Sequence, residues 1–142
     1  MIRKYKASDE DQIIHVWHKS SDLAHPFLTE EFQKLEKINI REIYLPQTKT
    51  WVFEEDENII GFISMLGNEL GAIFVLPEYI GKGIGSELFL HVREVYGDLT
   101  VRVFEKNNIG RKFYDKKGFK LIREENHEET GETILFMKLD AN

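Results

Sequence analysis

The sequence predicts a mixed α/β fold in a single domain that spans residues 1–142. Three observations support this prediction. The length of 142 residues suits one domain, and a hydrophobic content of 42% is sufficient for one core. The apolar residues alternate between strand-like and helix-like spacing along the whole chain, without a repeat or a linker. The expected order of elements is β-α-α-β-β-β-α-β-α-β-β.

The first third of the chain is expected to hold one strand and two helices. Residues 1–5 form the strand, and Ser8 caps the first helix, with acidic residues beside it at the positive end of the helix dipole. Thr29 begins the second helix, and Pro46 marks the end of this helical region. The apolar side of the first helix is formed by Ile13, Ile14, Trp17, Leu23 and Ala24. That of the second is formed by Phe32, Leu35 and Ile38.

The middle of the chain has the composition of a sheet. Residues 50–53 and 59–65 are β-branched and aromatic runs, and the acidic residues 54–58 between them indicate a hairpin turn. Residues 70–76 are apolar on both faces, which is typical of a central strand, and Pro77 ends this strand.

The last third alternates helices and strands. Residues 83–96 are expected to form an amphipathic helix that Gly97 stops, with Ile84, Leu88, Val92 and Val95 on its apolar face. A strand over 99–104 and a basic helix over 107–117 follow, and Gly118 is the expected C′ residue of that helix. Strands over 119–122 and 133–139 close the chain around a polar turn at 124–132.

Composition excludes several classes of protein. The absence of cysteine excludes disulfides, thiolate metal sites and a cysteine nucleophile, and it suits a reducing, cytoplasmic location. No apolar run reaches the ~20 residues of a membrane span, and residues 1–20 are too polar for a signal peptide, so no membrane association is expected. The net charge of −6 argues against nucleic acid as a partner.

One segment departs from this acidic balance. Residues 102–120 carry a net charge of +5. A basic segment in an acidic chain favours an anionic ligand, and the alternative is a helix with a solvated basic face. His15 and His18 are spaced to share a metal, but they have no third ligand in a recognisable pattern, and no metal site is expected.

A glycine-rich turn, Gly81-Lys-Gly-Ile-Gly-Ser86, joins the central strand to the amphipathic helix. Glycines allow successive backbone N–H groups to face a ligand, and the helix behind them adds its positive end, which favours a phosphate or pyrophosphate. The Walker A pattern is excluded, because no Gly-Lys-[Ser/Thr] follows a glycine after a gap of four residues. A dinucleotide-binding fold is an alternative, because Glu105 ends the next strand about where an acidic residue would bind the ribose. Against it, Ser86 occupies the position of the third glycine in the dinucleotide-binding motif. A connection that binds no ligand is the remaining alternative.

Two motifs at a fixed distance narrow this choice. Val75-x-Pro77-x-x-x-Gly81-x-Gly83-Ile84-Gly85 is followed by Asn107-x-x-Gly-Arg-x-Phe113-Tyr114-x-x-x-Gly118-Phe119. The pair resembles the Gcn5-related N-acetyltransferase (GNAT) superfamily. His25-Pro-Phe-Leu28 and Phe104-Glu-Lys-Asn107 make the chain similar to the bacterial YiaC/YjaB group, which acts on protein lysines.

The resemblance implies a mostly antiparallel sheet of about six or seven strands, with helices on both faces, splayed in the middle to admit acetyl-CoA as co-substrate. It places the pantetheine arm against the backbone of Phe74, Val75 and Leu76 and within reach of Asn107. It places the pyrophosphate on the N–H groups of Gly81, Lys82, Gly83, Ile84, Gly85 and Ser86. Ile80 stands where the family usually has Arg or Gln, for which a modest cost in affinity is expected.

The resemblance also implies the chemistry. Tyr114 matches the family tyrosine that protonates the departing thiolate, and the N–H of Val75 would face the thioester carbonyl as an oxyanion donor. The absence of cysteine favours direct attack by the acceptor amine in a ternary complex. The general base is open between Glu69, just before the central strand, and His25, which alternatively shapes the acceptor site. Arg102 occupies a position where some relatives carry a glutamate.

The acceptor is expected to be a primary amine on a protein lysine or an N-terminus. The alternatives are a small amine such as a polyamine or aminoglycoside, or a non-catalytic module that only binds CoA. The acidic segment 124–132 is a candidate for attracting a cationic acceptor. The oligomeric state is open between monomer and homodimer.

Overall fold

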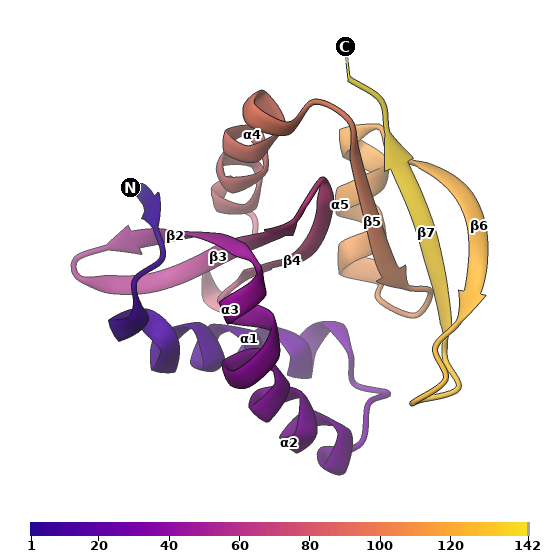
Figure 1. The fold of residues 1–142 in the computed structure, drawn as a ribbon, viewed down its shortest axis with the longest axis horizontal. Helices are drawn as coiled ribbons and strands as arrows, with labels where there is room; N and C mark the ends of the chain where they lie inside the picture. The colour runs from indigo at the N-terminus through magenta and orange to yellow at the C-terminus, as the bar shows by residue number, and fades with distance from the viewer. Residues whose placement is uncertain (142) are drawn as a thin grey trace.

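The computed structural model describes residues 1–141, which form a seven-stranded sheet in the order β1-β2-β3-β4-β5-β7-β6 (Figure 1). The strands are β1 (Ile2–Lys4), β2 (Lys49–Glu55), β3 (Asn58–Leu66), β4 (Glu69–Val75), β5 (Leu99–Phe104), β6 (Lys120–Asn126) and β7 (Thr133–Leu139). The helices are α1 (Glu10–Ala24), α2 (Glu30–Asn39), α3 (Leu45–Gln47), α4 (Ile84–Tyr96) and α5 (Asn108–Lys117), with a π-helical turn (Ile40–Tyr44) between α2 and α3. The predicted order of elements and the mostly antiparallel sheet are confirmed.

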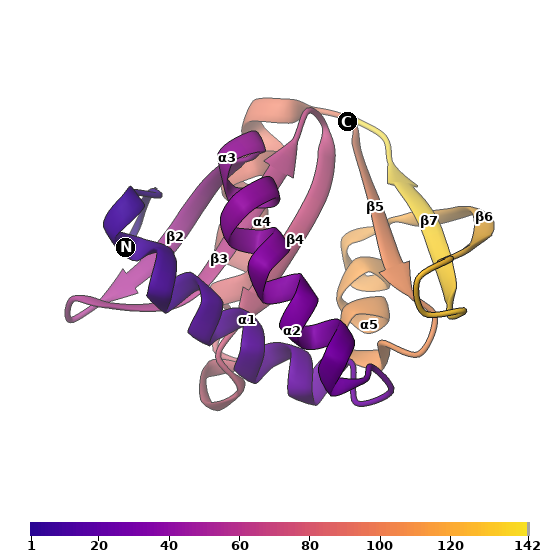
Figure 2. The same cartoon turned by 60° about the horizontal axis from the view of Figure 1, so that its bottom comes forward.

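The sheet opens between its two central strands. β4 and β5 run parallel and pair only at Glu69 with Thr100 and Leu70 with Val101. Directly after Leu70 the register of β4 against β3 shifts, which leaves Gly71 as an extra residue on β4. A bulge bends a strand and increases its twist, so β4 turns away from β5 here, and Figures 1 and 2 show the two strands separating. The predicted splay is confirmed.

Helices cover both faces of the sheet, α1 and α2 on one side and α4 and α5 on the other (Figure 2). Each side has its own hydrophobic core. The core beneath α1 includes Ile13, Val16, Val52, Ile59 and Phe62. The core beneath α4 and α5 includes Ile63, Leu88, Val92, Val101 and Met137. Because β3 is covered on both faces, its residues are buried almost from end to end.

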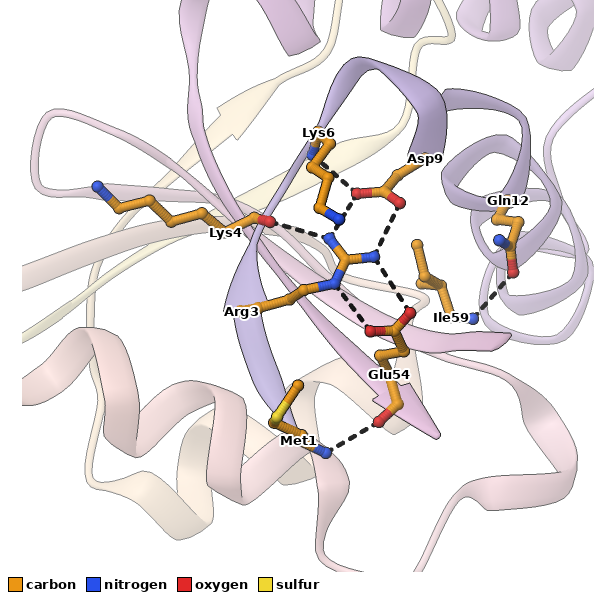
Figure 3. Close-up of polar contacts among 8 residues, drawn as sticks. All are labelled: Met1, Arg3, Lys4, Lys6, Asp9, Gln12, Glu54 and Ile59. Carbon is orange, nitrogen blue, oxygen red and sulfur yellow. Dashed lines mark hydrogen bonds and ion pairs between the residues drawn. The ribbon is translucent and has the colours of Figure 1, made fainter. Parts of the chain in front are cut away.

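The start of α1 differs from the predicted serine cap. α1 begins at Glu10, and its N-cap residue is Asp9 and not Ser8; the Asp9 side chain makes no capping bond to the helix and instead accepts the Lys6 N–H at 2.7 Å (Figure 3). Arg3 binds that carboxylate at 2.8 Å and also binds Glu54 on β2 at 2.9 Å. Arg3 holds the pKa of Asp9 below its usual range, and a charge-assisted partner of this kind is stronger than a hydroxyl.

Three helix faces were predicted incorrectly in part. Leu35 and Ile38 are 49% and 51% exposed, so the spacing by three residues does not mark the buried side of α2. Leu23 on α1 is exposed, and Val95 on α4 is 67% exposed. By helical rotation Val95 lies on the same side of α4 as Ile84, Leu88 and Val92, so its exposure reflects its place in the last turn of the helix and not its spacing.

Two turns are shorter than predicted. The acidic run 54–58 belongs mostly to β2 and β3, and the hairpin turn consists of Asp56 and Glu57, both with positive φ. β6 runs to Asn126, where it still pairs with Thr133, and the turn covers residues 127–132. The helical region ends at Gln47, one residue after Pro46. Within residues 1–141, the model has no helix with both the length and the apolar composition that a bilayer crossing requires.

Candidate active site

A cavity of about 860 Å³ occupies the gap between β4 and β5. Its walls come from distant parts of the chain: the α1–α2 loop, β4, the glycine turn, β5 and α5. His25, Val75, Gly83, Asn107 and Tyr114 all line it. Because the splay removes the neighbour of β4, the strand exposes unpaired backbone groups to this space.

The register of β4 decides which backbone groups face the cavity. The Leu76 N–H donates to the Ile60 carbonyl at 2.8 Å, so these residues form a hydrogen-bonded pair. In an antiparallel ladder such pairs alternate, and Val75 opposite Gly61 therefore turns its N–H and carbonyl away from β3, toward the gap. The carbonyl of Val75 accepts the Ser20 hydroxyl at 2.8 Å. The Val75 N–H is therefore left to face a ligand in the gap.

Phe74 and Leu76 were also expected to contact the pantetheine arm through their backbones, but the same register turns their backbone groups away from the gap. The Leu76 N–H is bound to Ile60, and the Leu76 carbonyl accepts the Tyr79 N–H at 2.8 Å. Phe74 lies opposite Phe62 in a hydrogen-bonded pair position, so its backbone groups also turn toward β3. The sequence could not predict which residues of β4 turn their backbone groups toward the gap, because this depends on how β4 pairs with β3. Phe74 lines the cavity, whereas Leu76 packs against the hydrophobic core.

The glycine turn has the geometry of an anion site. Gly81 and Gly83 have φ values of 88° and 84°, and Gly83 directly precedes α4. The backbone N–H groups that follow are the unpaired ones at the helix start, where the dipole favours negative charge. The cavity is lined here by Ile80, Gly81, Gly83, Ile84, Gly85 and Ser86. The side chain of Lys82 lies instead over the Tyr79 ring, at 5.2 Å.

The basic segment of α5 lies beside this turn. Lys117 Nζ donates to Ser86 Oγ at 2.8 Å, and Lys112 and Lys116 line the same cavity. The predicted concentration of positive charge thus occurs at the end of the cavity where the α4 N-terminus lies. Helix end and ammonium groups together can bind a polyanion such as a phosphate-bearing cofactor.

His25 and Asn107 connect the two halves of the molecule. The Asn107 Oδ1 accepts the Gly110 N–H at 2.9 Å and caps α5, which turns the Nδ2 group toward His25 Nε2 at 3.1 Å. Because Nδ2 can only donate, Nε2 carries the lone pair, and the ring N–H is on Nδ1, where it donates to Ser21 Oγ at 3.1 Å. Both nitrogens of His25 are engaged inside the protein. A base function would require the bond to Asn107 to break.

Burial keeps His25 neutral. The ring is 8% exposed and packs edge-on against Phe27, Phe74 and Phe104. This burial lowers the pKa of His25 to about 4, from an ordinary value of 6.5. At neutral pH the imidazole is uncharged, which fits an orienting contact to Asn107.

This pKa gives a prediction for acid stability. The folded protein resists protonation of His25, whereas the unfolded chain binds the proton near pH 6.5, so stability falls as the pH drops from about 6.5 to 4. We expect this group to remove about 3 kcal/mol between pH 7 and pH 4. Urea unfolding of wild type and His25→Gln at both pH values measures it. An equal acid loss in both proteins would contradict the buried neutral ring.

Tyr114 lies on α5 with its ring in the core. It is 6% exposed, packs against Phe113 and Phe119 with ring centroids 5.5 and 5.3 Å away, and still lines the cavity. Burial raises the pKa of Tyr114 above its ordinary value near 10. The phenol therefore carries its proton at every physiological pH, which is the state that a general acid needs.

Glu69, the other candidate base, lies at the start of β4 and lines the cavity. Its Oε1 is 2.7 Å from Arg102 Nη1, and Arg102 also binds Glu125 on β6 at 2.8 Å. Glu69 is thus part of an ion-pair network at the cavity edge. Of the two histidines on α1, His15 is exposed and His18 Nε2 lies 3.5 Å from Asp22 Oδ2, one turn away.

Some residues of the cavity were not identified from the sequence. Glu36 on α2 and His127 in the β6–β7 turn both line it. For Glu36 a signal was present, because Phe32, Glu36 and Ile40 are spaced by four residues and so share a helix face. Ser20, which binds Val75, gave no signal, since a serine inside a helical pattern is ordinarily a surface residue.

Comparison with known proteins points to one family. The family profile described as "Acetyltransferase (GNAT) domain" matches residues 46–121. The chain is 32% identical over 123 residues to the peptidyl-lysine N-acetyltransferase YiaC of Escherichia coli, which covers 86% of this chain and 84% of YiaC.

Two solved structures share the fold. The solution structure of apo YjaB from Escherichia coli has a TM-score of 0.86 and 27% identity, over 97% of this chain and 95% of that one. The crystal structure of the PaiA N-acetyltransferase from Thermoplasma acidophilum in complex with coenzyme A has a TM-score of 0.74 and 25% identity, over 98% of both chains.

Proposed function

Because the chain belongs to the GNAT family of acetyltransferases, with acetyl-CoA as co-substrate, we propose that it transfers the acetyl group to the side-chain amine of a protein lysine. One observation carries the catalytic part of this proposal. The outward-turned N–H of Val75, the glycine turn and Tyr114 surround a single cavity in the split sheet. The choice of acceptor is supported by YiaC, which is named as a peptidyl-lysine N-acetyltransferase.

Different residues of the cavity would bind different parts of acetyl-CoA. The N–H groups from Gly81 to Ser86 and the lysines of α5 would hold the phosphates of the co-substrate. The N–H of Val75 would donate to the thioester carbonyl and stabilise the charge that develops on its oxygen. Asn107, oriented by His25 and its own cap on α5, would present its second amide hydrogen to the pantetheine arm.

Acetyl-CoA supplies an activated acyl group with a thiolate as leaving group. The amine attacks it directly, since the chain has no cysteine to carry an acyl intermediate. The amine attacks in its neutral form; Tyr114 would donate its proton to the departing thiolate, and the proton that the nitrogen loses on forming the amide would restore the phenol. His25 acts in this scheme as a positioning residue, because its lone pair is bound to Asn107.

A CoA-release assay tests the acceptor. We expect the highest kcat/KM with a peptide that carries one internal lysine and a blocked N-terminus. The same peptide with a free N-terminus and no lysine, spermidine and an aminoglycoside serve as the competing acceptors. A preference for spermidine or the aminoglycoside would replace the proposed substrate class, and no CoA release with any of these amines would mean a binding module without turnover.

A further inference from the structure

Helix α2 and the π-helical turn after it present one continuous face to the cavity. Phe32, Glu36, Ile40 and Tyr44 line the cavity at steps of four residues. Two of the described residues that line the cavity carry a carboxylate, Glu36 and Glu69. Glu69 is already bound to Arg102 at 2.7 Å. The charge of Glu69 is therefore already paired with a cation, whereas Glu36 has no ion pair within residues 1–141 and can bind a cationic ligand.

The partners of Glu36 are neutral. Asn39 Nδ2 and the Tyr44 hydroxyl both donate to Glu36 Oε1, each at 3.3 Å, and Oε2 takes no part in these bonds. Asn39 lies three residues along the same helical segment, and Tyr44 lies in the π-helical turn. The widened turn thus brings a phenol over the carboxylate. The two donors orient Glu36 without neutralising its charge.

The opposite wall of this part of the cavity comes from the β6–β7 turn. His127 in the β6–β7 turn contacts the rings of Phe32 on α2 and Phe104 on β5, with centroids 5.8 and 5.2 Å away, so this turn approaches α2. Glu129 follows His127 in the turn. Burial, with a contribution from Glu129, raises the pKa of Glu36 above its ordinary value. A carboxylate that is partly removed from water is stabilised by a cation beside it.

The cavity thus has two electrostatic ends. The lysines of α5 and the start of α4 form the end that suits phosphates, while Glu36 and the β6–β7 turn form an acidic end between the N-terminal helices and the last hairpin. We propose that Glu36, held by Asn39 and Tyr44, binds the ammonium group of the acceptor as it enters the cavity. This assignment rests on the proposed lysine acetyltransferase function, and it makes Glu36 the residue that selects a positively charged acceptor.

The variant Glu36→Gln tests the assignment. The amide oxygen of glutamine can still accept from Asn39 and Tyr44, so the variant is expected to fold with an unchanged thermal midpoint. We expect the KM for the blocked single-lysine peptide to rise about 10- to 100-fold, the loss of one charge-assisted hydrogen bond. The Kd for acetyl-CoA, measured by calorimetry, is expected to stay within about two-fold of wild type, because the phosphate end is untouched.

A matched control separates charge at this site from charge in general. Glu42→Gln makes the same change in net charge at an exposed residue outside the cavity wall, and it is expected to leave the peptide KM unchanged. Equal KM values for wild type and Glu36→Gln would overturn the assignment of Glu36 and leave the proposed function standing. Failure of wild type to release CoA with the peptide would overturn the proposed function and, with it, this acceptor site.

Discussion

Replacement of Tyr114 by phenylalanine is expected to lower kcat for acetyl transfer by about 10²- to 10⁴-fold, the usual contribution of a positioned general acid. The ring is buried between Phe113 and Phe119, and phenylalanine preserves that packing. What the variant lacks is the hydroxyl, which carries a proton that burial makes harder to lose. CoA release at saturating acetyl-CoA and lysine peptide measures the effect.

Two further measurements make this result specific. The Kd for acetyl-CoA should be the same in Tyr114→Phe and wild type, because the phosphates are bound by the glycine turn and α5. The wild-type rate should show no decline from ionisation of Tyr114 up to pH 10. Unchanged turnover in Tyr114→Phe would remove this residue as the proton donor.

Replacement of Gly83 by valine is expected to weaken acetyl-CoA binding by about 100-fold or more, equivalent to losing two charge-assisted hydrogen bonds of ~1.5 kcal/mol. Gly83 has a φ of 84° and directly precedes α4, and a Cβ there would have none of residues 1–141 outside its own neighbours within 4 Å. In the proposed complex that space belongs to the pyrophosphate. Calorimetric titration with acetyl-CoA measures the loss.

Valine at position 83 has two effects: it strains the backbone, because φ is positive there, and it blocks the binding site. A control variant is needed to separate them. Gly67 in the β3–β4 turn also has positive φ, at 59°, and open space around it, so Gly67→Val carries similar backbone strain, about 1–2 kcal/mol, at a residue that does not line the cavity and lies outside the glycine turn. We expect Gly67→Val to lose stability but to bind acetyl-CoA as wild type does. Normal binding by Gly83→Val would exclude the glycine turn from cofactor binding.

The fold was predictable from the sequence where a local pattern determines the structure. The order of elements, the Thr29 cap of α2 and the left-handed Gly118 at the end of α5 follow from spacing and capping preferences. The position of the glycine turn, between a central strand and a helix, followed in the same way. The split of the sheet came from the resemblance to a family, since no local pattern encodes it.

The parts that were missed depend on contacts between distant segments. Asp9 stands at the N-cap of α1 in place of Ser8, and its carboxylate is bound to Arg3, which also binds Glu54 when β1 pairs with β2. The backbone of Leu76 faces β3 because of its pairing with Ile60. Pattern alone cannot supply such a register.

The candidate bases illustrate the same limit. His25 and Glu69 were selected for residue type and position, and both line the cavity. Their bonds to Asn107 and Arg102 come from other elements of the fold and change what each can do. Glu36, which the structure brings to the cavity between Asn39 and Tyr44, was an ordinary acidic residue of an amphipathic helix in the sequence.

A crystal structure of the protein with coenzyme A tests the central claim most directly. We expect the pyrophosphate on the N–H groups of residues 81–86 and the CoA sulfur within about 4 Å of the Tyr114 hydroxyl, close to hydrogen-bond reach. A CoA molecule that lies outside the gap between β4 and β5, or whose sulfur is remote from Tyr114, would contradict it.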